Sequence, residues 1–192
     1  MLFRSSYAAA GVDIAAADAT VARYRAIAAR TVQPQVMGGV GPFAGLWRLG
    51  AGYRDPVIVS SADGVGTKLR IAIAAGRYDT VGQDLVNHCV NDIAVIGARP
   101  LFFLDYIGAE KLEPAVFTQL LKGFAKACKA AGCAIVGGET AQMPGMYAPG
   151  EYDLAGTIVG VVDRPKLLDG SRIRPGDIVL GIASNDLHTN GY

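Results

Sequence analysis

The segment SSADGVGTK combines a carboxylate, two glycines, a hydroxyl and a lysine at the expected junction between a strand and a helix. Asp63 offers oxygens to Mg²⁺, and backbone amides at Gly64 and Gly66 can approach a phosphate closely. Thr67 and Lys68 lie where the helix starts, and a helix N-terminus favours negative charge. The segment therefore indicates a nucleotide–metal site, while an ordinary junction capped by Asp63 is the alternative. The GxxxxGK[ST] spacing of a Walker loop is absent.

The helix expected over residues 80–96 carries five polar side chains among apolar ones: Asp84, Asn87, His88, Asn91 and Asp92. Spacings of four residues place Asp84 near His88 and His88 near Asp92. A buried helix holds such groups at low cost only where they are hydrogen-bonded or used. Asn91 and Asp92 form an oxygen-rich pair that suits Mg²⁺. A solvated stripe is the alternative, and it is the interpretation that we favour for His88.

Two glycine-rich motifs could also contact a ligand. Glu139, in GGETAQMPGMY, is expected at the carboxyl end of a strand, where α/β proteins gather their ligands, although it could instead cap a turn. The loop over residues 36–45 resembles a flap over phosphates, and a plain loop is equally compatible with its composition. Its candidate phosphate-binding glycines are Gly38, Gly39 and Gly41.

These side chains must be positioned by alternating helices and strands. Asp13 can cap a helix over residues 13–31. The pattern predicts a short buried strand over 56–61, a helix from Thr67 to Gly76, the helix over 80–96, and a helix from Pro114 to Gly132. Further strands are expected over 101–108, 134–140 and 154–163.

The sequence from residue 166 onward reads as the start of a second unit. Turns are expected at Asp169-Gly170 and Pro175-Gly176, followed by an apolar strand over residues 177–184. Such a strand needs partners, and little sequence follows it, so we expect a truncated domain. In the final polar cluster NDLHTNGY, His188 could transfer protons near neutral pH, or it could have a structural role.

The composition narrows the possible partners. The chain has 192 residues, of which 51% are hydrophobic and 18% charged, as in globular proteins. A net charge of +1 gives the protein no overall positive potential to attract a polyanion, so we do not expect it to bind nucleic acid. No apolar run approaches the ~20 residues of a membrane span. The three cysteines form no CxxC pair, which favours buried, reduced thiols in a cytoplasmic protein.

Taken in order, several strings resemble one family. MGGVGPFAGL, DGVGTKL, CVNDI, GARPLFFLDYIG, GGETAQMPGMY, DLAGTIVGVV and LHTNGY are similar to the N-terminal portion of phosphoribosylformylglycinamidine cyclo-ligases, also called aminoimidazole ribonucleotide synthetases. The resemblance covers nearly the whole chain. DGVGTK alone resembles a wider superfamily that includes thiamine-monophosphate kinase, selenophosphate synthetase and a hydrogenase maturation factor. LFFLDY with GGETAQMPGMY distinguishes the cyclo-ligases.

The resemblance implies an ATP-dependent and Mg²⁺-dependent ring closure in purine biosynthesis, from formylglycinamidine ribonucleotide to aminoimidazole ribonucleotide, ADP and phosphate. It implies that Asp63, Asp92 and Glu139 bind the metal. Catalytic roles are expected for Lys68, Asp92 and His188, the last in proton transfer. The implied nucleotide-binding residues are Gly38, Gly39, Gly41, Asp63, Gly64, Gly66, Thr67, Lys68 and Asn91, and those on the substrate side are Thr140, His188 and Asn190.

The implied fold is α/β, of α+β type: a PurM-like N-terminal ATP-binding domain whose mixed sheet pairs across a homodimer. We expect an N-terminal helix and glycine-rich loop over 1–55, the ATP-binding domain over 56–165 and the truncated domain over 166–192. Ala62 stands where the family usually has Thr, and Asp186 where it usually has Gly. Ala62 removes one hydroxyl near the phosphates, and Asp186 adds a negative charge and a side chain to a tight turn near the substrate. A nucleotide-binding module without ring-closing activity, or another kinase or synthetase of the superfamily, are the alternatives.

Overall fold

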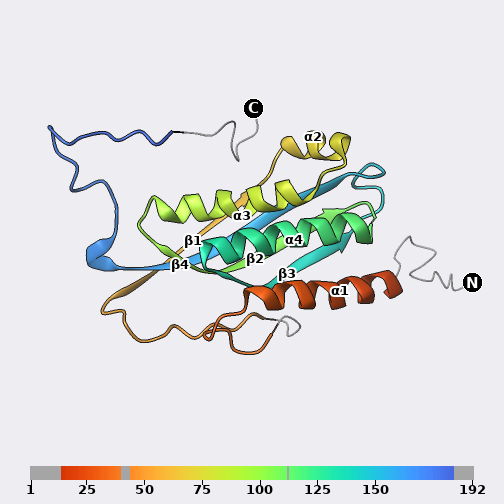
Figure 1. Cartoon of the computed structure of the whole chain (residues 1–192), viewed down its shortest axis with the longest axis horizontal. Coiled ribbons are helices and arrows are strands. Elements are labelled where there is room, and N and C mark those ends of the chain that lie inside the picture. The colour runs from red at the N-terminus through yellow and green to blue at the C-terminus, as the bar shows by residue number, and fades with distance from the viewer. Residues whose placement is uncertain (1–13, 40–43, 112, 184–192) are drawn as a thin grey trace, which may run out of the picture.

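The computed structural model describes residues 14–39, 44–111 and 113–183, which form a four-stranded sheet with helices on one face (Figure 1). The helices are α1 (Ile14–Ala28), α2 (Lys68–Ala75), α3 (Asp79–Ala94) and α4 (Pro114–Ala131). The strands are β1 (Pro56–Gly64), β2 (Arg99–Ala109), β3 (Ala134–Gln142) and β4 (Tyr152–Asp163). Short 3-10 turns follow α1 at Ala29–Thr31 and β4 at Arg164–Lys166. The predicted α/β class with a mixed sheet is therefore confirmed.

The strand order is β1-β4-β2-β3, with β1 and β3 at the two edges. β4 runs antiparallel to both β1 and β2, whereas β2 and β3 are parallel. β1, β2 and β3 therefore point the same way, and their carboxyl ends lie at one end of the sheet. One straight row of paired residues crosses all four strands there: Asp63, Gly156, Asp105 and Gly138.

Helices α3 and α4 lie side by side over the sheet because two glycines let their backbones approach closely. A β-carbon at Gly82 would lie 2.5 Å from the carbonyl oxygen of Leu120, and one at Gly123 would overlap that of Asp79. Beneath them the fully buried Phe103 packs on Phe124, with ring centroids 6.1 Å apart. Burying each such side chain contributes about 1.5–3 kcal/mol, so the packing of this layer stabilises the fold.

Two of the helices begin or end at the proline and glycine residues expected from the sequence. Pro114 begins α4 at its first turn, and Gly132 ends it in the left-handed conformation, at φ 69°. Gly76 ends α2 in the same way, at φ 61°. These predictions of helix ends are confirmed. The predicted helix α1 and the predicted strands β2, β3 and β4 are also present. Asp13, the predicted cap of α1, lies outside the described residues.

Two predictions about strands are wrong. β1 is longer than predicted and is an edge strand rather than a buried one: its side chains alternate between half-buried and exposed, and Ile58 is 57% exposed. Residues 177–183 form no strand within the described part of the chain, and Val179 is 95% exposed. The reason is physical, since a strand forms only against a partner that accepts its hydrogen bonds. The turns at Asp169-Gly170 and Pro175-Gly176 are present.

Candidate functional site

The SSADGVGTK segment crosses from the end of β1 to the start of α2, directly under one side of α3. Along β1 alternate residues point to opposite faces, and Ser61 and Asp63 lie on the face that α3 covers. Gly66 follows in the left-handed conformation, at φ 73°, and a β-carbon there would meet nothing within 4 Å. Lys68 then begins α2. The strand, the turn and the helix thus bring a carboxylate, open backbone and a lysine together.

Three residues of α3, spaced four apart, contact this segment. The distances are 2.6 Å from Lys68 Nζ to Asp84 Oδ2, 3.5 Å from Asp63 Oδ2 to His88 Nδ1, and 2.6 Å from Ser61 Oγ to Asp92 Oδ2. Spacing of four residues keeps the three α3 side chains on one side of the helix. Three of the polar residues of α3 therefore contact the segment that the sequence singled out for phosphate and metal binding.

Asp63 is held at two points yet remains accessible. Its Oδ1 accepts a hydrogen bond of 2.7 Å from the amide of Gly64, and its side chain is 43% exposed. An exposed, oriented carboxylate beside a helix N-terminus suits the coordination of a divalent ion that carries phosphate. The residues present therefore fit the Mg²⁺ and ATP that the sequence implies.

His88 lies inside this arrangement rather than on a solvated stripe, so the interpretation that we favoured for it is wrong. The residue is 8% exposed, and its Nδ1 lies 3.3 Å from the carbonyl oxygen of Gly64 as well as 3.5 Å from Asp63. The polar neighbours at i−4 and i+4 were the available signal. They could not show that β1 covers this side of α3, because that is decided by the packing of the helix on the sheet.

Asn91 and Asp92 are both exposed on α3. Asp92 is oriented by the hydroxyl of Ser61, which donates to it. Because Ser61 and Asp63 share one face of β1, Asp92 lies over the same strand as Asp63. The structure thus brings Asp63, Asp92 and Lys68 to one side of α3.

Glu139 lies elsewhere in the chain. It is inside β3 rather than beyond its end, is exposed, and is in register with Tyr106. Gly138, the residue before Glu139, belongs to the row of paired residues that contains Asp63. Successive residues of a strand point to opposite faces, so Glu139 points to the face of the sheet opposite Asp63. Three strand spacings separate the two edges, about 14 Å. Among the residues that the structure describes, no group of three or more His, Cys, Asp or Glu side chains could hold a metal ion.

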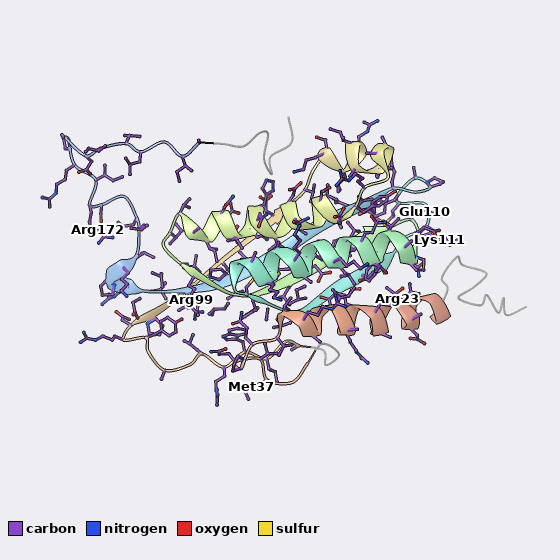
Figure 2. The ribbon with its side chains drawn as sticks, in the orientation of Figure 1. Arg23, Met37, Arg99, Glu110, Lys111 and Arg172 are labelled. Carbon is purple, nitrogen blue, oxygen red and sulfur yellow. The ribbon has the colours of Figure 1, made fainter. Side chains whose placement is uncertain are left out.

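The glycine-rich loop is also remote from α2. An isolated bridge joins Val36 to Trp47, so the two ends of the loop lie together. Met37, which precedes Gly38, lies across the molecule from α2 (Figure 2). Gly38 and Gly39 are exposed with open space around them, and Thr140 shares the helix-covered face with Ile107. Three candidate residues lie outside the described part of the chain: Gly41, His188 and Asn190.

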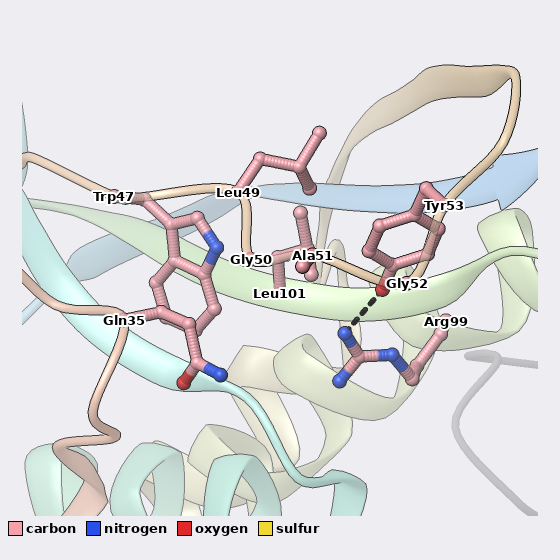
Figure 3. Close-up of a pocket in the computed structure, with 9 residues that line it drawn as sticks. All are labelled: Gln35, Trp47, Leu49, Gly50, Ala51, Gly52, Tyr53, Arg99 and Leu101. Atoms are coloured by element: carbon pink, nitrogen blue, oxygen red, sulfur yellow. Dashed lines mark hydrogen bonds between the residues drawn. The ribbon is translucent and has the colours of Figure 1, made fainter.

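A separate hollow of about 270 Å³ lies where β2 begins (Figure 3). Trp47 and Tyr53 form part of its wall, and Arg99 donates a hydrogen bond to the Tyr53 hydroxyl. Arg99 is in register with Val161 of β4, far along the sheet from the Asp63 row. This hollow contains none of the residues that the sequence singled out.

The sheet also holds a buried acid that the sequence did not reveal. Asp105 is 3% exposed, and Tyr24 of α1 donates a hydrogen bond to its Oδ1. Burial raises the pKa of Asp105 to about 7, although the bond from Tyr24 opposes the rise. Its Oδ2 has no partner among the described residues. In LFFLDY this aspartate looks like a polar residue of an ordinary strand, and only the packing of α1 makes it a buried contact.

The three cysteines are free and buried, as predicted. Cys89 lies on α3 near the site, and burial raises the pKa of its thiol to about 12. It is therefore a protonated packing residue. None of the helices in the described ranges is long and apolar enough to cross a membrane.

Comparison with known proteins finds relatives that match nearly the whole chain. The chain is 57% identical over 187 residues to a phosphoribosylformylglycinamidine cyclo-ligase of Sorangium cellulosum, and 56% identical over 188 residues to one of Anaeromyxobacter dehalogenans. Each match covers 97% of this chain and 54% of the relative, so the chain spans about half the length of these curated relatives.

Solved structures with the same fold are more distant in sequence. The thiamine-monophosphate kinase of Stenotrophomonas maltophilia matches with a TM-score of 0.60 and 23% identity, over 74% of this chain and 42% of that one. A hydrogenase maturation protein HypE in complex with ATP matches with a TM-score of 0.55 and 21% identity, over 78% and 42%. Residues 44–162 match the family described as AIR synthase related protein, N-terminal domain. The chain therefore belongs to the AIR synthase related protein family, with the Asp63–Lys68 segment inside the matched domain.

Proposed function

We propose that this chain is the nucleotide-binding half of a phosphoribosylformylglycinamidine cyclo-ligase, which closes the imidazole ring in purine biosynthesis at the expense of ATP. The observation that carries the proposal is the meeting of Asp63, Gly66 and Lys68 under one side of α3. The names of relatives at 54–57% identity support the reaction. The ATP complex of the hydrogenase maturation protein supports the nucleotide, since that protein shares the fold.

In this proposal Asp63 and Asp92 hold Mg²⁺ on the triphosphate. The metal does not need three protein ligands, because Mg²⁺ keeps several waters and is bound by one or two carboxylates together with phosphate oxygens. Glu139 lies on the other face of the sheet, so it can join them only from a second copy of the chain. Asn91, the exposed residue before Asp92 on α3, is proposed to contact the same phosphate group.

Lys68 and the backbone amides at Gly64, Gly66 and Thr67 would stabilise charge on the transferring phosphoryl group. Such transfer depends mostly on positioning and electrostatic stabilisation. Lys68 is oriented for this by Asp84. The loop glycines Gly38, Gly39 and Gly41 are proposed to contact the phosphates from a second copy of the chain, because within one chain the loop lies across the molecule from α2 (Figure 2).

The ring closure needs two bond exchanges. The amide oxygen of formylglycinamidine ribonucleotide takes the γ-phosphoryl group and ATP leaves as ADP. The amidine nitrogen then bonds to the activated carbon, loses a proton, and the carbon–oxygen bond breaks to release phosphate. Holding both groups in one pocket favours closure over hydrolysis. We propose His188 for the proton transfer, and Thr140 and Asn190 for substrate contacts.

We also propose a homodimer formed through the sheet face that no helix covers. That face carries Ile58, which is 57% exposed, and the half-buried Phe102, Leu104 and Val159. Apolar side chains gathered on an open face are typical of an interface. We further propose that the protein acts in the cytoplasm, which its free, buried cysteines support.

Two experiments test the function. The first joins the remaining portion of the Sorangium cellulosum relative after Tyr192 and assays ring closure with ATP, Mg²⁺ and formylglycinamidine ribonucleotide. We expect the fused protein to form aminoimidazole ribonucleotide and the 192-residue chain to turn over poorly or not at all. Phosphorylation of another small molecule, such as thiamine monophosphate, without ring closure would favour a different member of the superfamily.

The second experiment measures binding of a non-hydrolysable ATP analogue to the 192-residue chain by calorimetry, with and without Mg²⁺. Asp63→Asn should weaken Mg²⁺-dependent binding by tenfold or more, on the order of 1.4 kcal/mol. Unchanged binding would show that Asp63 is not a metal ligand. Binding without ring closure in the fused protein would identify a non-catalytic nucleotide-binding module.

A further inference from the structure

We propose that His88 is a positioning residue for the metal site: it fixes the Asp63 carboxylate and the Gly64 carbonyl at the end of β1. The inference rests on the proposed role of Asp63 and adds a residue to it. His88 does not contact the metal or the nucleotide in this proposal. It acts on them only through Asp63.

The contacts of His88 converge on one junction. Its Nδ1 lies 3.3 Å from the carbonyl oxygen of Gly64 and 3.5 Å from Asp63 Oδ2. The other carboxylate oxygen, Oδ1, accepts from the amide of Gly64. Both oxygens of Asp63 and both backbone polar groups of Gly64 thus take part in one small network, at the point where the strand gives way to the turn.

The neighbours also determine which ring nitrogen carries a proton. Both groups near Nδ1 are oxygens that can only accept, so Nδ1 must be the donor. Nε2 is buried without a partner among the described residues. Leaving a buried polar atom unsatisfied is costly, so an apolar side chain would be preferable here if the position served only to fill space.

The flanking contacts show that α3 holds the SSADGVGTK segment through several side chains. Asp84 holds Lys68 and Asp92 holds Ser61, one helical turn to either side of His88. His88 is the central contact and the only one of the three α3 side chains that is buried. Residues that orient a metal-binding carboxylate are expected to change metal affinity by 10–100-fold when they are replaced.

The test compares variants of the 192-residue chain. His88→Leu keeps the volume and removes the donor, whereas His88→Asn places an amide donor near the position of Nδ1. Asn87→Ala, an exposed neighbour on α3, is the control for general effects of substitution on the helix. The readouts are the Mg²⁺ concentration that half-saturates binding of a non-hydrolysable ATP analogue, the affinity for that analogue without Mg²⁺, and the thermal midpoint.

We expect His88→Leu to raise the half-saturating Mg²⁺ concentration about tenfold and to leave the metal-free nucleotide affinity unchanged. His88→Asn should stay within about threefold of the wild type, because the donor is kept. An equal Mg²⁺ requirement in the wild type and His88→Leu, with Asp63→Asn impaired, would overturn the role of His88 and leave the proposed function intact. If the wild type shows no Mg²⁺-dependent nucleotide binding, both proposals fall.

Should His88→Leu fail to fold, His88→Gln replaces it. Its amide reaches toward the position of Nε2 rather than Nδ1, so it should show the raised Mg²⁺ requirement while His88→Asn does not. Equal behaviour of the glutamine and asparagine variants would contradict the donor role of Nδ1.

Discussion

The hydroxyl of Tyr24 on α1 donates a hydrogen bond to the carboxyl group of Asp105 on β2, which lies 81 residues away in the sequence. The same hydroxyl is 2.9 Å from the carbonyl oxygen of Gly137 on β3. One side chain of α1 thus contacts two neighbouring strands. Because burial raises the pKa of Asp105 to about 7, we expect the hydrogen bond between Tyr24 and Asp105 to depend on pH.

The unfolding free energy should fall as the pH rises from 5 to 8. In the unfolded chain Asp105 titrates near 3.8, and in the folded chain near 7, so the folded protein holds the proton more tightly. The stabilisation is complete below about pH 4 and is lost as the pH passes through about 7. The expected loss between pH 5 and pH 8 is roughly 2–3 kcal/mol, from about 1.4 kcal/mol per tenfold change in proton affinity. Urea unfolding at several pH values measures it.

Asp105→Asn is the matched variant, since an amide has the same shape and does not titrate in this range. It should remove most of the pH-dependent difference. Tyr24→Phe should cost about 1–3 kcal/mol by leaving a buried acceptor unpaired. A wild-type protein whose stability is independent of pH between 5 and 8 would show that Asp105 is not a buried titrating acid.

Gly123→Ala should destabilise the protein by about 1–3 kcal/mol, because overpacking forces the helices apart. A β-carbon at Gly123 would overlap the backbone oxygen of Asp79, where α3 and α4 meet. Gly181→Ala is the control, since a β-carbon there meets nothing within 4 Å. Chemical unfolding of the two variants should differ clearly, and equal stabilities would contradict the close crossing.

Lys68→Met should weaken binding of the ATP analogue by about tenfold, which corresponds to 1.4 kcal/mol. Lys68 begins α2 and is paired with Asp84, with its side chain 17% exposed. Arg70→Met, an exposed cation two residues later, controls for the general loss of positive charge. If both variants lose affinity equally, the effect is one of net charge and not of the position of Lys68.

Replacing Ile178, Val179 and Leu180 together by serine should leave the unfolding free energy within about 0.5 kcal/mol of the wild type. These side chains are 84–95% exposed and contribute no packing. Removing them should also reduce self-association of the 192-residue chain, measured by light scattering. Ile158→Ser, at a fully buried position of β4, is the contrasting variant and should cost several kcal/mol.

Much of the chain's local structure could be predicted from its residues. Helix ends could be predicted correctly at Pro114, Gly76 and Gly132, because the backbone preferences of proline and glycine act locally. The β-branched residues of β4 were sufficient to predict that strand, because their backbone preferences also act locally. The SSADGVGTK segment could be predicted as a nucleotide–metal site because its carboxylate, glycines and lysine lie within a few residues of each other, and this role stays a prediction.

What only the tertiary structure decided was which side chains meet across the sequence. Asp63 meets His88 because α3 packs over β1, and Tyr24 meets Asp105 because α1 lies against β2 and β3. The order β1-β4-β2-β3 puts Asp63 and Glu139 at opposite edges and on opposite faces. Residue spacing fixes contacts within one helix or strand, whereas contacts between elements depend on strand order and helix packing, which arise from burial of the whole core.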